Sequence, residues 1–186
     1  MQRRILPVLA ALTIAALVLA TPASATYLSS GSGTNVFSVY HYPANPTWET
    51  YMDHARICWN ATSTTTGTSI SQTSSSSAIK KIQAGSWSTT WTGLYSPSGS
   101  RASRTFLIQL NADRIAWIRE TYPGSVSFGT WAAWTACHEM GHALSLADNP
   151  SGYTSLTSIM KYPVSWATTL YSTPRTHDIN EVASYY

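Results

Sequence analysis

Charged residues are scarce in this chain of 186 residues: Asp, Glu, Lys and Arg make up 10% of it, and the formal net charge is +3. Because there is no basic patch, we expect neither nucleic acid nor an acidic membrane surface as a partner. The sequence is instead rich in Ser, Thr, Trp and Tyr. This composition suits an extracellular protein that uses hydroxyl groups for solubility.

Long apolar runs are also missing, apart from one near the N-terminus. Arg3 and Arg4 precede an apolar stretch at residues 5–20, and Ala23-Ser24-Ala25 forms a small-x-small cleavage site. Together these features predict a secretory signal peptide at residues 1–25. An uncleaved membrane anchor is the alternative, but the apolar run is short for a membrane span. We therefore expect residues 26–186 to form one secreted domain, monomeric and free of the membrane after cleavage.

Cysteine is nearly absent, with only Cys58 and Cys137. In an exported protein two cysteines predict one disulfide, and two buried free thiols are the alternative. The bond would tie an early helix to the residue just before His138. Closing so long a loop is worth up to about 4 kcal/mol in the chain-entropy model.

Two stretches, residues 36–40 and 104–111, have the alternation of half-buried β-strands. The apolar face of the second stretch would comprise Phe106, Ile108 and Leu110. Residues 61–77 are rich in Ser and Thr, which favours half-exposed strands joined by loops, with a linker as the alternative. Residues 85–104 read as a loop or a hairpin.

Two helices are predicted from apolar residues at helical spacing. Thr47 is a plausible N-cap for the first, and Thr130 for the second. The apolar stripe of the first helix comprises Trp48, Tyr51, Met52, Ala55 and Trp59. The buried stripe of the second comprises Ala133, Ala136, Met140, Leu144 and Ala147. The second helix has a core side and leaves His138 and His142 displaced toward another face.

The second helix contains the sequence His138-Glu139-Met140-Gly141-His142. Helical residues four apart stand on one face, so the two histidines can bring two imidazole nitrogens to one metal ion. Glu139 then lies beside the metal without binding it. This is the H-E-x-x-H arrangement of zinc hydrolases, in which the carboxylate takes a proton from the attacking water. A chance match with two satisfied histidines is the alternative.

The sequence from His138 to Asp148 resembles the metzincin zinc endopeptidases, whose motif adds a third ligand six residues after the second histidine. Asp148 occupies that position, where most of the clan has histidine and the snapalysin family has aspartate. The resemblance implies an α+β fold with a twisted mixed β-sheet, an N-terminal helix, an active-site helix and a C-terminal helix. It also implies one Zn²⁺ held by His138, His142 and Asp148, with Glu139 as the general base.

Two later segments extend this resemblance. Ser158-Ile159-Met160-Lys161-Tyr162 is similar to the Met-turn of astacins and serralysins. It implies that Met160 forms an apolar floor beneath the metal and that Tyr162 reaches the metal or the oxyanion. Residues 176–186 resemble the closing helix of matrixins. The resemblance is specific over roughly the last third of the chain and is one of element order before it.

The sequence departs from the metzincin pattern at Ser145, which stands where glycine usually takes a left-handed turn. On a continuous helix Asp148 would point away, since six residues advance the direction by about 240°. The helix must therefore end before Asp148, at a cost of about 1 kcal/mol or more for a left-handed residue with a Cβ. His177, Asp178 and Asn149 are the rival third ligands.

The predicted function is hydrolysis of polypeptides by a secreted zinc endopeptidase. The metzincin resemblance implies that residues 106–110 form the edge strand that pairs with the substrate. Two alternatives stay open. One is a non-catalytic binding protein with a structural zinc that uses Trp87 and Trp91, for example for cell-wall sugars. The other is a zinc amidase that acts on cell-wall peptide. Nothing in the sequence indicates whether calcium binds.

Overall fold

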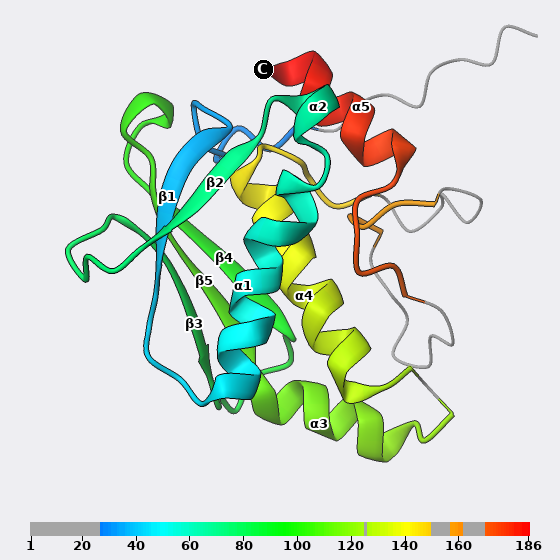
Figure 1. Cartoon of the computed structure of the whole chain (residues 1–186). Helices are drawn as coiled ribbons and strands as arrows, with labels where there is room; N and C mark the ends of the chain where they lie inside the picture. The colour runs from blue at the N-terminus through cyan, green and yellow to red at the C-terminus, as the bar shows by residue number, and fades with distance from the viewer. Residues whose placement is uncertain (1–26, 125, 150–156, 162–169) are drawn as a thin grey trace, which may run out of the picture.

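The computed structural model describes residues 27–124, 126–149, 157–161 and 170–186. The predicted signal peptide and Tyr162 lie outside these residues and stay predictions. A five-stranded sheet forms one layer, and helices α1 (Pro46–Asn60) and α4 (Phe128–Ala143) pack together across it (Figure 1). No helix in the described part of the chain is long and apolar enough to cross a membrane.

The sheet is twisted and mixed. Its strands are β1 (Val36–His41), β2 (Ser69–Thr73), β3 (Lys80–Gly85), β4 (Gly93–Ser98) and β5 (Thr105–Asn111). They lie in the order β2-β1-β3-β5-β4, and all pairs are parallel except β4, which runs antiparallel to β5. With the helices this makes the mixed α+β fold that the sequence predicts.

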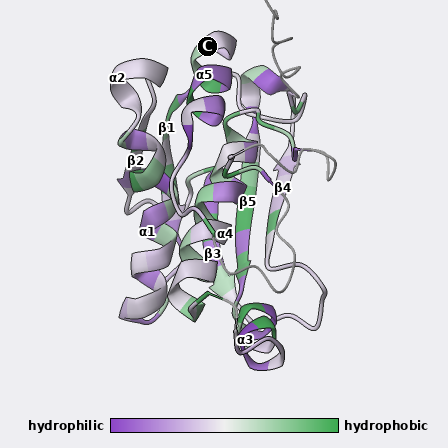
Figure 2. Ribbon diagram, turned by 90° about the vertical axis from the view of Figure 1, so that its right-hand side faces the viewer, coloured by the Kyte–Doolittle hydropathy of each residue, from purple (hydrophilic) through white to green (hydrophobic). Residues whose placement is uncertain are grey.

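The edge strands of this sheet are β2 and β4, and the expectation that residues 106–110 form an edge strand is wrong. β5 pairs with β3 on one side and with β4 on the other (Figure 2). β4 arises within the segment that the sequence predicts as a loop or a hairpin. Pro97 suits an edge, because proline lacks the N–H that an inner strand uses for pairing. At this end of the sheet the strand with a free edge for a bound peptide is therefore β4.

The helix starts differ by a few residues from the predicted ones. Asn45, not Thr47, caps α1, since its Oδ1 accepts a hydrogen bond from the N–H of Trp48 at 3.1 Å. Ser127, not Thr130, caps α4. The other helices are α2 (Ser63–Thr66), α3 (Ala112–Thr121) and α5 (Thr176–Tyr185). At the starts of both α1 and α4, a residue two or three positions earlier, with an equally good acceptor oxygen, is the N-cap.

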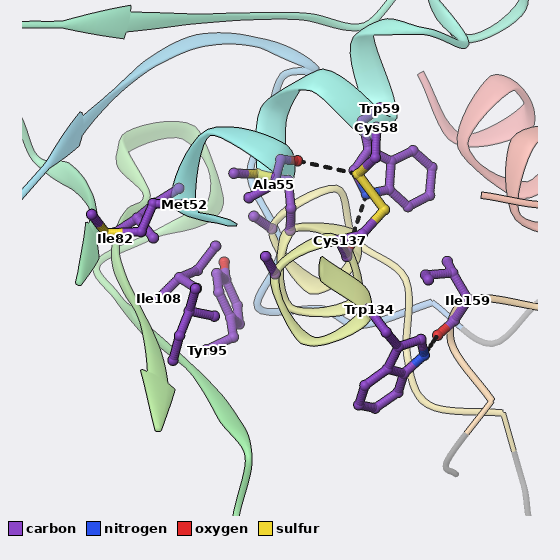
Figure 3. Packing of buried hydrophobic residues seen from close by; sticks show 14 of the residues in the cluster. Met52, Ala55, Cys58, Trp59, Ile82, Tyr95, Ile108, Trp134, Cys137 and Ile159 are labelled. Carbon is purple, nitrogen blue, oxygen red and sulfur yellow. Dashed lines mark hydrogen bonds between the residues drawn. A yellow bond between two sulfur atoms is a disulfide. The ribbon is translucent and has the colours of Figure 1, made fainter. Parts of the chain in front are cut away.

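The core lies between α1, α4 and the sheet (Figure 3). Cys58 on α1 and Cys137 on α4 form a disulfide with their Cα atoms 6.2 Å apart. Beside it, the indole N–H of Trp59 donates to the carbonyl oxygen of Cys137 at 2.9 Å. Trp59 is fully buried. The helix that carries the histidine motif is thus joined to its neighbour by a disulfide and a hydrogen bond.

Candidate metal centre and its cleft

The two motif histidines on α4 are oriented by backbone carbonyl groups. The Nδ1 atom of His138 lies 3.0 Å from the carbonyl oxygen of Ile159. The Nδ1 atom of His142 lies 2.8 Å from that of Leu146. Because a carbonyl only accepts, each Nδ1 carries a proton, and each Nε2 is the ring nitrogen left to bind a metal. This is the arrangement that metal-binding histidines usually have.

A left-handed residue ends the motif helix. α4 stops at Ala143, and Ser145 has a φ angle of 70°. The N–H of Leu146 donates to the carbonyl oxygen of Gly141 at 3.0 Å, which closes the turn. Ser145 thus makes the turn that glycine makes in the metzincin pattern. The chain then folds back toward the histidines.

This turn brings Asp148 to the motif. Its Oδ1 lies 3.1 Å from Nε2 of His138 and 3.7 Å from Nε2 of His142. The three ligand atoms all lie within 4.8 Å of one another. Two ligands of a tetrahedral zinc ion, each about 2.0 to 2.1 Å from the metal, would be roughly 3.3 Å apart. The three side chains therefore fit a metal ion in both their chemistry and their spacing.

The rival third ligands are engaged elsewhere. The carboxylate of Asp178 is fully buried and accepts hydrogen bonds from Ser158 Oγ and from the N–H of Ile159. The amide of Asn149 donates to Ser158 Oγ at 2.7 Å. His177 lies 3.3 Å from the carboxylate of Glu181. In the described residues, the group of His, Cys, Asp and Glu side chains that could hold a metal is His138, His142 and Asp148.

Met160 lies against the motif helix and is fully buried. A Cβ on Gly141 would lie 2.4 Å from its sulfur atom, so a side chain at position 141 would displace Met160. The N–H of Asn149 donates to the carbonyl oxygen of Met160 at 2.9 Å. The same turn supplies the Ile159 carbonyl that orients His138. Met160 thus sits in a turn that links both ends of the site.

Glu139 is buried on the cleft side of α4, with 6% of its surface exposed. It is hydrogen bonded to the backbone of Tyr95 on β4. Gly93, on the same strand, gives it room: a Cβ there would lie 2.5 Å from Glu139 Oε1. The edge strand therefore fixes the position of this carboxylate.

Burial is the largest influence on the pKa of each titratable group in the cluster. It lowers the pKa of His142 to about 4, helped by the charge of His138, and it raises the pKa of Glu139 to about 7. Burial also works to lower the pKa of His138, but the bond to Asp148 and the charge of Glu139 raise it overall. Burial works to raise the pKa of Asp148, and the contact with His138 outweighs it and lowers that pKa. His142 and Asp148 are therefore ready at neutral pH to bind a cation, which needs deprotonated ligands.

The cluster opens into a cleft of about 440 Å³. β4 and the residues before it form one wall, with Trp91, Gly93 and Tyr95. α4 and α3 form the other wall and contribute Trp131 and Arg114. Sequence reasoning missed β4 and Arg114 as parts of the site. Pro97 is the signal that could have marked β4 as an edge strand.

No family model matches this sequence, and no curated protein does. Among solved structures the chain is similar to myroilysin, a metalloprotease, with 16% identity and a TM-score of 0.51 over 86% of this chain and 97% of that one. A second myroilysin structure gives 15% identity, covering 88% of this chain and 86% of that chain. The GM1-bound form of the ECX AB5 holotoxin is similar at 14% identity and a TM-score of 0.51, over 82% and 80% of the two chains. At these identities the likeness concerns the fold, which is metalloprotease-like.

Proposed function

We propose that this protein is a secreted zinc-dependent endopeptidase. The observation that carries the proposal is the convergence of His138, His142 and Asp148 beside the buried Glu139, in a cleft bordered by an edge strand. The fold shared with myroilysin supports it. Export rests on the signal peptide predicted at residues 1–25, and the disulfide between Cys58 and Cys137 is consistent with an oxidising compartment.

The metal in this proposal is zinc, held by the Nε2 atoms of His138 and His142 and by the carboxylate of Asp148. Two histidines and one carboxylate are a typical ligand set of catalytic zinc sites. When bound, zinc supplies a Lewis acid and lowers the pKa of water toward neutrality. The hydrogen bonds from the two Nδ1 atoms to backbone carbonyls keep both rings in the tautomer that this requires.

Glu139 is the proposed general base. Its carboxylate accepts a proton from the water that attacks the scissile carbonyl, and then delivers that proton to the leaving amine. Gly93 and the backbone of Tyr95 hold the carboxylate at the cleft wall for both transfers. Tyr162 is proposed, from the Met-turn resemblance alone, to donate a hydrogen bond to the developing oxyanion.

The proposed substrate is an extended polypeptide that pairs with β4. This strand already uses one edge for β5, and its other edge borders the cleft. A peptide added there would gain main-chain hydrogen bonds and would run past Glu139 and the histidines. The role first expected for residues 106–110 therefore passes to residues 93–98.

The two alternative functions are a glycan-binding protein and a zinc amidase. The position of the aromatic residues bears on the first, and the metal site bears on the second. Trp87 and Trp91 contact each other with ring centroids 5.4 Å apart, but Trp91 lines the same cleft as Glu139. Trp91 is part of the proposed substrate site and Trp87 contacts it, and this argues against a separate glycan-binding surface. A zinc amidase would keep the same metal site, and substrate profiling with casein and cell-wall peptides distinguishes it from an endopeptidase.

The proposal is tested by casein hydrolysis with the purified protein. We expect activity that a zinc chelator abolishes and that zinc restores. Glu139→Ala should bind zinc with unchanged stoichiometry and lose the hydrolysis. Undiminished proteolysis by Glu139→Ala would end the proposal.

A further inference from the structure

Arg114 lines the same cleft as Glu139 and the two motif histidines. It lies in the first turn of α3, and Ile118, one turn further on the same face, lines the cleft as well. Of the described residues that line the cleft, Arg114 is the one Lys or Arg side chain. Residues 150–156 and 162–169 contain no Lys, Arg, Asp or Glu. Arg114 is therefore the source of positive side-chain charge in this wall.

The Arg114 guanidinium has no carboxylate partner. The chain has eight Asp and Glu residues, and the structure describes all of them. None of the ion pairs between described residues involves Arg114. Its neighbour Asp113 accepts a hydrogen bond from Ser86 instead, at 2.7 Å. Arg114 Nε is buried and makes no hydrogen bond in the described part of the chain.

The surroundings hold Arg114 in place. Its guanidinium carbon lies 3.9 Å from the ring centroid of Trp117, a stacking contact that fixes the plane of the group and leaves its N–H edges free. The fully buried Asn111 caps α3. The Asn111 amide also donates to the carbonyl oxygens of Trp87 and Trp91. One buried residue thus fixes both the start of the Arg114 helix and the aromatic loop beside it.

We propose that Arg114 selects substrates that carry a carboxylate close to the scissile bond. A planar guanidinium can donate two parallel hydrogen bonds to a carboxylate, and a carboxylate would satisfy the buried Nε. The group can be the side chain of Asp or Glu, or the C-terminal carboxylate of a short peptide. This inference rests on the proposed peptidase function and adds the class of substrate.

The test uses matched fluorogenic peptides and the purified protein. One series compares Glu with Gln at each of three positions on either side of the scissile bond. A second compares a free C-terminus with its amide. For one pair we expect kcat/KM to be roughly 10- to 100-fold higher for the carboxylate peptide, as a charge-assisted hydrogen bond gives. The series that shows the difference identifies the source of the carboxylate.

Substitutions assign the preference to Arg114. Arg114→Gln should cleave both members of the selective pair at similar rates, and Arg114→Glu should favour a Lys peptide. Arg114→Lys keeps the charge without the planar fork and should retain part of the preference, so the test does not depend on one variant folding. Arg119→Gln is the matched control. It removes the same charge from the same helix, at a residue outside the cleft lining that bonds to Pro123.

A binding measurement separates this inference from the proposed function. Calorimetry with unlabelled carboxylate and amide peptides is carried out on Glu139→Ala and on Glu139→Ala with Arg114→Gln. If the wild-type protein hydrolyses no peptide, yet the carboxylate peptide binds more tightly in an Arg114-dependent way, the peptidase proposal fails and the assignment of Arg114 stands. Equal binding and equal cleavage of both peptides, or a preference that survives Arg114→Gln, overturns the assignment.

Discussion

Ser145 and Tyr186 face each other with their hydroxyl oxygens 3.1 Å apart. Both hydroxyls also lie within hydrogen-bonding distance of the carbonyl oxygen of Ser32, at 3.3 Å and 2.8 Å. The carbonyl oxygen of Ser145 accepts from the N–H of Leu28 at 2.8 Å. The left-handed turn that delivers Asp148 is therefore held by the segment before β1 and by the end of α5. These contacts offset the strain of a left-handed residue with a side chain.

Tyr186→Phe should weaken this turn. It removes two hydrogen bonds, so we expect a loss of about 1 to 2 kcal/mol in the free energy of unfolding and weaker zinc binding. Thermal unfolding and zinc titration measure the two effects. Tyr185→Phe is the control, because it removes the neighbouring hydroxyl while keeping the ring that stacks on Tyr27. Equal stability and zinc affinity in the two variants would show that the hydrogen bonds of the Tyr186 hydroxyl do not stabilise the turn.

Gly93→Ala should displace Glu139 without removing the metal ligands. The new Cβ would lie 2.5 Å from Glu139 Oε1 and from Thr135 Cγ2, so both side chains must shift relative to the strand. We expect kcat/KM on casein peptides to fall by about 10-fold or more, because a small misplacement of the general base slows proton transfer. Zinc content should not change. Gly124→Ala serves as the control, since a Cβ there has no atom within 4 Å. Wild-type rates in Gly93→Ala would refute the role of β4 in placing Glu139.

Replacing Cys58 and Cys137 together by serine should loosen the helix that carries the histidines. Removal of the disulfide, which spans a sequence separation of 79, should lower the free energy of unfolding by about 2 to 5 kcal/mol. Urea unfolding with and without a reductant measures this. The reductant should lower the midpoint of the wild-type protein and leave the double variant unchanged. A reductant-insensitive wild type would contradict the disulfide.

Chelation should destabilise the protein as well as inactivate it. An ion bound by His138, His142 and Asp148 ties α4 to the segment after its C-terminal turn, and a ligand at 100 times its Kd stabilises the folded state by about 2.7 kcal/mol. We expect the Tm to fall with a chelator and to recover with zinc. Asp148→Ala should show a much smaller change. A Tm of the wild-type protein that does not respond to metal would count against a site built from these residues.

The parts of the fold with strong local patterns could be predicted from the sequence. The alternation of β5 and the helical stripe of α1 correspond to the observed burial, because both follow from contacts that repeat along one element. The turn near Ser145 could be predicted too, since a continuous helix would carry Asp148 away from the histidines. In each case the geometry of a single segment determines which residues are buried or where the helix ends.

The parts that sequence reasoning missed depend on packing between distant segments. β4 contains Gly93, Pro97 and several polar residues, so its local pattern is that of a loop. Only pairing with β5 makes it a strand. Arg114 has no motif around it, and it reaches the cleft because α3 packs against α4. Asn111, which organises both walls, looks like an ordinary helix cap in the sequence.

The most direct test of the central claim is a crystal structure of the zinc-loaded protein with anomalous data at the zinc edge. We predict a single strong peak about 2.0 to 2.2 Å from Nε2 of His138, Nε2 of His142 and a carboxylate oxygen of Asp148, with Glu139 close by and not bound to it. A peak at another place, or a third protein ligand other than Asp148, would contradict the account.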